Sequence, residues 1–400
     1  MNIPTIKNLK LKNKSVLLRI DINSPVVKSK ILNNPRFEAS AKTIKYLLDK
    51  DAKVTIIAHQ GRKGDKDFTS LEQHAKILSK YVKSNIKYIP SLFEEKAKSS
   101  ILSLKSKQAV LLKNVREYED ETNLKLKDNR YPKFCKLFDI YVNEAFSVSH
   151  RAQGSIIIPP KYLKSVIGLE CESEIKALEK FKKSKAKSKV FILGGSKAED
   201  YFPLFNFLKN KNNKLLAAGV LANLFLIAKG YNLGYESQWL KQNNFLPLIP
   251  KLKSIYTKYE NQIILPLDFA FLSKEGKRVE FTLENAPFKY KIYDVGKNTL
   301  NLYKDELRYT DYIFMKGPLG FSEIREFSFP TVSLLKTISS LTKNKKLFSL
   351  LGGGHLNTTI KKHKIPKNFS YNSLSGGALI KYISGEKLPG IEAIKNKKWI

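Results

Sequence analysis

The chain has 400 residues, of which 42% are hydrophobic and 27% are charged, and 72 basic against 36 acidic residues give a formal charge of +36. This composition excludes a disordered chain and favours a soluble, globular protein of about two domains. The two cysteines form no CxxC pair, which excludes a disulfide scaffold or a zinc ribbon. No apolar run has the length of a membrane span, and the N-terminus lacks the apolar core of a signal peptide. We therefore expect a cytoplasmic protein.

The sequence leaves two explanations of the positive charge open. Lysines are scattered over every segment, so a general bias of composition toward lysine and asparagine accounts for them. The same charge would suit a polyanion, and a nucleic-acid-binding protein is therefore an alternative. Nucleic-acid modules interleave aromatic and basic residues on one surface, and the sequence shows no such ordered stripe.

Apolar, β-branched runs alternate with longer amphipathic segments, a pattern that predicts an α/β fold with parallel sheets. In the first half the predicted strands are 15–20, 54–58, 86–89, 110–112 and 140–142. In the second half they are 190–193, 215–218, 263–266, 292–294, 312–315, 347–351 and 369–372. The predicted helices include 40–49, 70–80, 170–182, 222–229 and 331–341.

Ligands of an open parallel sheet bind beyond the carboxyl ends of its strands, so the residues that follow each strand are the first candidates for a site. In the first half these positions carry polar and basic side chains: Asp21, Asn23, His59, Arg62, Arg116 and Arg151. In the second half they carry glycines and one lysine: Gly194, Gly195, Lys197, Gly219, Gly317, Gly352, Gly353, Gly354, Gly376 and Gly377. Glycines allow the main chain to approach a ligand closely, and N–H groups at a helix start attract phosphate.

Only nine of the 72 basic residues are arginine, so an arginine is expected where a planar, bidentate donor binds phosphate or carboxylate. Four of them are predicted to converge on one anion: Arg36, Arg62, Arg116 and Arg151. Each arginine alone could instead form a surface ion pair of little energetic value. Asp21 and Asn23 suit the hydroxyl groups of the same ligand, or they serve only a turn.

The sequence argues against a metal centre or a hydrolase nucleophile. The five histidines show no metal-ligand spacing, and we predict no metal ligand in the protein itself. His74 and His363 lie in polar, helix-like segments and are expected to be bystanders. GGSK fits neither the Walker A nor the GxGxxG spacing, and no GxSxG motif is present.

These pieces, in this order, resemble phosphoglycerate kinase over nearly the whole chain. In the first half the resemblance rests on LLRIDINSP, AHQGRKG, LLKNVREYEDE and YVNEAFSVSHRAQGS. In the second half it rests on FILGGSKAED, LPLDFAF, IFMKGPLGFSE, LLGGGHLNT and YNSLSGGALIKYISGEKLPGIEAI. Nine stretches in register make the resemblance specific, and SHRAQ and GGGH are similar to the archaeal branch of the family.

The resemblance implies two Rossmann-like, three-layer α/β/α domains with parallel sheets, joined by an interdomain helix and a hinge. We expect a 3-phosphoglycerate-binding domain over residues 1–169, an interdomain helix over 170–182 and a nucleotide-binding domain over 183–387. Residues 388–400 would pack back on the N-terminal domain. The implied reaction is the reversible, in-line transfer of a phosphoryl group between 1,3-bisphosphoglycerate and ADP, giving 3-phosphoglycerate and ATP in glycolysis and gluconeogenesis.

The resemblance also assigns the candidate residues. The phosphoglycerate site would take Asp21, Asn23, Arg36, His59, Arg62, Arg116 and Arg151. The nucleotide site would take Gly194, Gly195, Lys197, Gly219, Gly317, Glu323, Gly352, Gly353, Gly354 and His355, with Glu323 at the ribose. Phosphoryl transfer itself would depend on Arg36, Lys197, Gly376 and Gly377. Mg²⁺ would be bound through the phosphates of ATP or ADP, and we expect a monomer, with a dimer as the alternative, and no membrane partner.

The chain departs from the family pattern mainly in its nucleotide half. A lysine often found at position 201 is Tyr201, the asparagine before GP is Lys316, and the aspartate that often ends GGGD is His355. The STGGG run is SLSGG over residues 373–377, which removes a hydroxyl and a glycine, and the aspartate of YVNDAF is Glu144. A phosphoglycerate kinase-like pseudoenzyme is therefore a second alternative to an active kinase.

Overall fold

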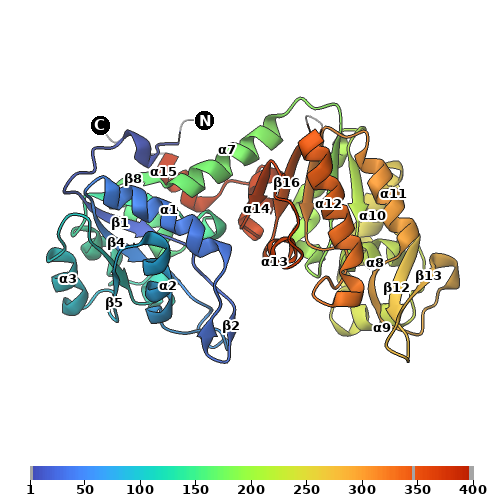
Figure 1. Cartoon of the computed structure of the whole chain (residues 1–400), viewed down its shortest axis with the longest axis horizontal. Helices are drawn as coiled ribbons and strands as arrows, with labels where there is room; N and C mark the ends of the chain where they lie inside the picture. Colours follow the sequence, from blue (N-terminus) through green and yellow to red (C-terminus); the bar gives the residue numbers. More distant parts are fainter. Residues whose placement is uncertain (1–2, 345–346, 396–400) are drawn as a thin grey trace. The chain divides into compact units, whose positions relative to one another are not determined.

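The computed structural model describes residues 3–344 and 347–395, which fold into two compact units. The chain passes from the first unit into the second after Lys176, within helix α7 (Leu169–Lys183). It returns to the first unit after Gly385. Figure 1 labels many of the elements along the chain, and each unit is described below by itself.

A parallel sheet of six strands, in the order β5-β6-β4-β1-β7-β8, forms the centre of the first unit. Its strands are β1 (Ser15–Arg19), β4 (Lys53–Ile57), β5 (Ile86–Ile89), β6 (Ala109–Leu112), β7 (Ile140–Asn143) and β8 (Lys164–Ile167). A separate antiparallel pair consists of β2 (Val26–Val27) and β3 (Lys30–Ile31). The helices are α1 (Pro35–Asp49), α2 (Glu72–Val82), α3 (Glu95–Leu102), α4 (Tyr131–Cys135), α5 (Gly154–Ile157), α6 (Pro159–Tyr162) and α15 (Pro389–Lys395).

Helices cover both faces of this sheet, because successive side chains of each strand point to opposite faces. On one face, Ile44 of α1 and Leu78 of α2 belong to the same buried cluster as Leu18 of β1. On the other face, Ile101 of α3 belongs to a cluster with Leu17, the preceding residue of β1. The unit is therefore a three-layer α/β/α sandwich.

The predicted C-terminal segment 388–400 is described as far as Lys395. Its helix α15 belongs to the first unit, where the N–H of Gly390 donates to the carbonyl oxygen of Ser149 at 2.9 Å. A Cβ added at Gly390 would lie 2.6 Å from a methyl carbon of Ile156, so only glycine allows this close approach.

The second unit is built on another parallel sheet of six strands, in the order β11-β10-β9-β15-β16-β17. Its strands are β9 (Lys189–Leu193), β10 (Lys214–Ala217), β11 (Ile263–Ile264), β15 (Tyr312–Lys316), β16 (Phe348–Gly352) and β17 (Tyr371–Ser373). The helices are α8 (Gly219–Ala228), α9 (Tyr235–Gln242), α10 (Ile249–Tyr259), α11 (Lys297–Leu307), α12 (Phe329–Asn344), α13 (Gly354–Lys362) and α14 (Gly377–Ser384). A long 3₁₀ segment, η5 (Ala198–Lys209), follows β9.

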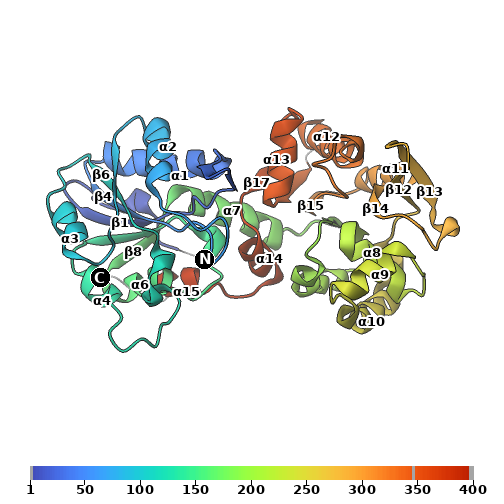
Figure 2. The same ribbon diagram turned by 90° about the horizontal axis from the view of Figure 1, so that it is seen from below.

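This sheet is also covered on both faces. Helices α11, α12 and α13 contribute to one cluster with the strands, for example through Leu335 against Met315. On the other face, Phe181 of α7 and Phe207 of η5 contact the ring of Phe191 on β9. In the view of Figure 2, α12 and α13 lie on one side of this unit and α8, α9 and α10 on the other. The predicted fold class, two three-layer α/β/α domains with parallel sheets, is confirmed.

One part of the strand prediction is wrong. The segment 292–294 was predicted within a parallel sheet, but β14 (Ile292–Val295) pairs antiparallel with β12 (Asp268–Leu272), which also pairs antiparallel with β13 (Arg278–Thr282). The short turn at Gly276, whose φ is +73°, folds β12 and β13 into a hairpin. A hairpin closes within a few residues, whereas parallel neighbours need a long crossover, so this sheet is antiparallel.

Candidate active site

The first candidate site lies at the carboxyl edge of the first sheet, where the predicted side chains follow four strands. They are Asp21 and Asn23 after β1, His59 and Arg62 after β4, Arg116 after β6 and Arg151 beyond β7. Arg36 joins them from the first turn of α1, whose N-cap Asn34 accepts the N–H of Arg36 at 2.9 Å. These seven side chains, with Arg36 among them, are called the arginine cluster below.

An ion pair between Asp21 and Arg36 holds the two groups together. Nη1 of Arg36 lies 2.7 Å from Oδ2 of Asp21, and Oδ1 of Asp21 accepts the N–H of Asn23 at 3.1 Å. Burial would raise the pKa of Asp21, but the charges of Arg36 and His59 and a hydrogen bond from Ser147 outweigh burial and hold this pKa well below its usual range. Asp21 is therefore ionised and orients the Arg36 guanidinium.

His59 is held neutral by a buried arginine that the sequence analysis did not select. Arg19 is fully buried, and its Nη2 lies 3.2 Å from Nδ1 of His59. A guanidinium can only donate, so Nδ1 accepts and the ring proton is on Nε2. Burial, with the charges of Arg19, Arg116 and Arg36, lowers the pKa of His59 well below its usual value, against the opposing effect of Asp21. His59 thus presents an N–H donor without a charge.

The buried charge of Arg19 is compensated through a serine. Nε of Arg19 donates to Oγ of Ser155 at 2.8 Å, and Nη1 donates to the carbonyl of Ile20 at 2.5 Å. The hydroxyl of Ser155 donates in turn to Oε1 of the buried Glu121 at 2.8 Å. Ser155 and Glu121 both lie inside the sequence stretches on which the family resemblance rests. That resemblance was the sequence signal that could have pointed to them.

Two members of the arginine cluster, Asn23 and Arg116, hold the main chain of Gly61 in the loop after β4. Oδ1 of Asn23 accepts the N–H of Gly61 at 2.8 Å, and Nη1 of Arg116 donates to the carbonyl of Gly61 at 2.5 Å. Burial and the charges of Arg19 and Arg151 lower the pKa of Arg116 to about 10. Burial and the charge of Arg62 likewise lower the pKa of Arg151.

The arginine cluster therefore brings together all seven residues predicted for the phosphoglycerate site. Its cations depress the pKa of one another, so a bound anion would relieve their repulsion. Planar guanidinium groups bind phosphate and carboxylate through paired hydrogen bonds. The cluster can hold a small ligand that carries both groups.

A second candidate site lies at the carboxyl edge of the second sheet, where glycines of three neighbouring strands contact one another. A Cβ added at Gly194 would lie 2.1 Å from the carbonyl oxygen of Pro318, and one at Gly317 would lie 2.3 Å from the carbonyl oxygen of Gly194. Gly219, with a φ of +54°, approaches Gly195 just as closely. We call Gly194, Gly195, Gly219 and Gly317 the glycine ledge. At Gly194, Gly219 and Gly317 the close main-chain contact within the protein leaves no room for a side chain, and at Gly195 the φ of +79° favours glycine.

The glycine ledge forms part of a pocket of about 400 Å³. Gly195 and Gly219 line it, and its walls are apolar side chains from several elements: Val220, Trp239, Phe269, Ile292 and Leu319. Flat apolar walls beside exposed main chain suit an aromatic base with attached phosphates. The sequence analysis missed these wall residues, because they lie apart in the chain and show no common spacing.

Only two of the remaining predicted nucleotide residues line this pocket. Glu323 and His355 both line it, and Nδ1 of His355 lies 2.6 Å from Oε1 of Glu323. Lys197 is exposed at the start of η5 and does not line the pocket. Added Cβ atoms at Gly353, Gly354 and Gly376 would meet no atom within 4 Å, so these glycines, unlike those of the ledge, border open space. Gly376 and Gly377 begin α14, and Gly354 begins α13.

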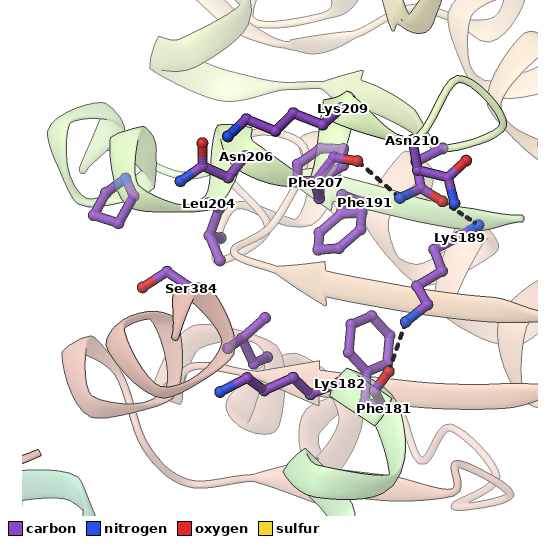
Figure 3. A pocket seen from close by; sticks show the side chains of 13 residues that line it. Phe181, Lys182, Lys189, Phe191, Leu204, Asn206, Phe207, Lys209, Asn210 and Ser384 are labelled. Carbon is purple, nitrogen blue, oxygen red and sulfur yellow. Dashed lines mark hydrogen bonds between the residues drawn. The ribbon is translucent and has the colours of Figure 1, made fainter. Parts of the chain in front are cut away.

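A second pocket, of about 370 Å³, lies on the face of the same sheet that Phe181 and Phe207 cover (Figure 3). It lies beside the start of β9, where Nζ of Lys189 donates to the carbonyl of Phe181 at 2.8 Å. Phe191 and Phe207 form its wall with ring centroids 3.6 Å apart. None of the predicted site residues lines this pocket.

His74 lies in a helix, as the sequence analysis expected, but its surroundings are buried rather than polar. It is fully buried in α2, its ring lies 5.8 Å from that of Phe37, and Nε2 lies 3.0 Å from Oε1 of Gln60. Gln60 also binds the main chain of Ser24, so His74 supports the loop that follows β1.

Within residues 3–344 and 347–395, no three histidine, cysteine or acidic side chains are grouped closely enough to hold a metal ion. Over the same residues, none of the helices combines the length and apolar character that crossing a bilayer requires.

Comparison with known proteins identifies this arrangement. A sequence profile of the phosphoglycerate kinase family matches residues 6–386. The phosphoglycerate kinase of Archaeoglobus fulgidus is 37% identical over 408 aligned positions, which cover 99% of this chain and 98% of that protein. That of Sulfolobus acidocaldarius is 35% identical and covers 100% of this chain and 97% of that protein. The crystal structure of phosphoglycerate kinase from Pyrococcus horikoshii superposes with a TM-score of 0.92 at 33% identity, and covers 98% of both chains.

The fold and the two sites define a two-domain α/β phosphotransferase. The chain belongs to the phosphoglycerate kinase family, as the sequence analysis predicted. The relatives named above are archaeal, and the structure of phosphoglycerate kinase from Coxiella burnetii gives a lower TM-score of 0.79 at 28% identity. The prediction of a kinase that transfers a phosphoryl group to a carboxyl group is confirmed, and nothing in the comparisons favours the pseudoenzyme alternative.

Proposed function

We propose that the arginine cluster binds 3-phosphoglycerate, or 1,3-bisphosphoglycerate in the reverse direction, and that the pocket at the glycine ledge binds ADP or ATP. The observation that carries the first assignment is the convergence of four arginines at one edge of the sheet: Arg36, Arg62, Arg116 and Arg151. Burial and the charges of neighbouring arginines lower the pKa values of His59, Arg116 and Arg151, and a bound anion would relieve the repulsion between these charges. Asp21 and Asn23 would orient the ligand's hydroxyl group, as the sequence analysis expected. The corresponding functional domains are residues 1–169 and 183–387, with 170–182 between them.

In this proposal the protein binds, orients and neutralises, and takes no covalent part. The P–O bond to ADP breaks as the P–O bond to the carboxylate forms, and no protein group gains or loses a proton. Arg36 and Lys197 would stabilise negative charge on the transferring group, and main-chain N–H groups at Gly376 and Gly377 would donate to it. Because the two ligands are assigned to different units, we propose that a hinge motion brings them together.

Mg²⁺ would accompany the nucleotide, held by its phosphates and by water, since the described residues provide no cluster of protein ligands. When bound, the ion would neutralise part of the phosphate charge. A cytoplasmic monomer is the corresponding proposal for location and oligomeric state.

A coupled assay with 3-phosphoglycerate and MgATP tests the proposed function. We expect turnover by the purified protein, and a loss of kcat on the order of 10²-fold in Arg36→Ala. Absence of turnover in a folded protein would support the pseudoenzyme alternative. A gel shift with RNA or DNA at physiological ionic strength separately tests the nucleic-acid alternative, and we expect none.

A further inference from the structure

Lys316, the last residue of β15, is a lysine whose side chain is largely buried. Only 8% of the residue is exposed, and over residues 3–344 and 347–395 its Nζ forms no ion pair and donates no hydrogen bond. Burial lowers the pKa of Lys316, the charge of Asp200 opposes this effect, and the charge of Lys197 lowers the pKa by a smaller amount. The stem of this lysine is buried, whereas its ammonium is not among the buried polar atoms that lack a partner, so the stem carries the charge to a point beside the glycine ledge where a ligand can reach it.

Tyr201 fixes the position of this ammonium. Nζ of Lys316 lies 5.0 Å from the centroid of the Tyr201 ring, and that ring is almost fully buried. The Tyr201 hydroxyl donates to the carbonyl oxygens of Gly194 and Lys316, at 2.5 and 3.2 Å. The ring is therefore tied to the ends of β9 and β15, and its face attracts the cation. Because the hydroxyl is already used, Tyr201 offers no donor of its own to a ligand.

The surroundings of Lys316 suit a phosphate. The N–H of Gly194 donates to the Lys316 carbonyl at 2.9 Å, which joins Lys316 directly to the glycine ledge. Lys197 follows the same ledge three residues after Gly194, and it acts electrostatically on Lys316. Asp200 compensates part of the charge of Lys316, and a phosphate near both ammonium groups and the main chain of the ledge would compensate more of it.

We propose that Lys316 is a second phosphate-binding cation of the glycine ledge, acting beside Lys197 on the terminal phosphates of the nucleotide. The proposal rests on the nucleotide assignment made above. Lys316 keeps its proton throughout the transfer, and its ammonium neutralises charge on the phosphate oxygens while the P–O bond to ADP breaks and the P–O bond to the acceptor forms.

The test replaces Lys316 by methionine, which retains an unbranched apolar stem over the Tyr201 ring and removes the charge. We expect Lys316→Met to lower kcat by about 10- to 100-fold and to weaken ADP binding about tenfold in calorimetry. Its unfolding in urea should need as much denaturant as the wild type, since the buried apolar stem is retained and no ion pair or hydrogen bond of Nζ within residues 3–344 and 347–395 is lost. Lys316→Arg, which keeps the charge, should recover most of both losses.

The matched control is Lys189→Met, at the opposite edge of the same sheet. Nζ of Lys189 also lies over aromatic rings, 5.1 Å from the centroid of Phe181 and 5.6 Å from that of Tyr312 (Figure 3 shows Lys189 and Phe181). We expect its kcat and its ADP affinity to stay within about twofold of the wild type, because it is remote from the ledge.

Three outcomes would overturn the inference. The kcat and the ADP affinity of Lys316→Met could both stay within twofold of the wild type, or Lys189→Met could lose as much of both. Lys316→Arg could also fail to recover either quantity. A wild-type protein without turnover would instead contradict the proposed function. In that case ADP calorimetry still decides the role of Lys316, because it needs no turnover.

Discussion

Alanine replacements at two glycines of the second unit should have opposite effects. A Cβ added at Gly194 would lie 2.1 Å from the carbonyl oxygen of Pro318, and this oxygen already accepts the N–H of Gly195 at 2.9 Å. Both atoms belong to the main chain, so the end of β9 and the loop after β15 must separate. Overpacking costs about 1–3 kcal/mol and the weakened hydrogen bond about 1 kcal/mol. Gly194→Ala should therefore lower the free energy of unfolding by about 2–4 kcal/mol.

At Gly354, the first residue of α13, the same added Cβ meets no atom within 4 Å. Alanine is favoured over glycine in a helix by roughly 0.5–1 kcal/mol, so Gly354→Ala should be at least as stable as the wild type. If a nucleotide phosphate approaches the start of α13, the new methyl group occupies its space. The KM for MgATP should then rise at least about tenfold, equivalent to about 1.4 kcal/mol.

Urea unfolding followed by circular dichroism measures the first effect, and the coupled assay measures the second. Each variant serves as the control of the other, since one should lose stability and the other affinity. The reasoning is refuted if Gly194→Ala unfolds at the wild-type urea concentration, or if Gly354→Ala is folded and keeps the wild-type KM.

Three further changes test the two sites separately. Lys197→Ala should lower kcat on the order of 10²-fold in the coupled assay, and near-normal turnover would remove Lys197 from the proposed site. Arg19→Lys should lower the free energy of unfolding by roughly 2–4 kcal/mol in urea titrations, because lysine cannot replace all the hydrogen bonds to Ser155, Ile20 and His59. Burial lowers the pKa of His74 from 6.5 to about 4, so the folded state binds fewer protons than the unfolded state between these values, and stability is lost as the pH falls through this window. His74→Phe should therefore reduce the loss of stability between pH 7 and pH 5 by about 2 kcal/mol, and an unchanged pH dependence would contradict this assignment.

The two parallel sheets could be predicted from the sequence because each central strand is a short apolar run bounded by polar residues. Strand β9 at 189–193 and strand β15 at 312–316 differ from their predicted bounds by one residue at one end. Strand β8 (Lys164–Ile167) was missed, since KSVI is too short to show a period. Strand β13 was missed because RVEFT is only partly buried and its polar residues resemble those of a loop.

The arginine cluster could be predicted because its members are charged side chains placed directly after strands. Arg19 could not, because its function follows from burial, and a sequence does not show whether an arginine at the end of a strand points into the core or into a site. Its contact with Ser155 spans 136 residues of chain, and the one with His59 spans 40. The apolar walls of the nucleotide pocket were missed for the same reason: Trp239 and Phe269 meet only in the folded chain.

Tyr201 and Lys316 show what is missed when a sequence is compared with its family pattern one position at a time. In the sequence they are two separate departures from the family pattern in the nucleotide half, 115 residues apart. In the structure the Lys316 ammonium lies against the Tyr201 ring, and the Tyr201 hydroxyl binds the Lys316 carbonyl. The two residues therefore form one unit at the glycine ledge. What matters for binding a phosphate is the position of the ammonium group, not the position of the residue in the chain. Under the proposal above, Lys316 on β15 would supply the cation that a lysine at position 201 on η5 would otherwise supply.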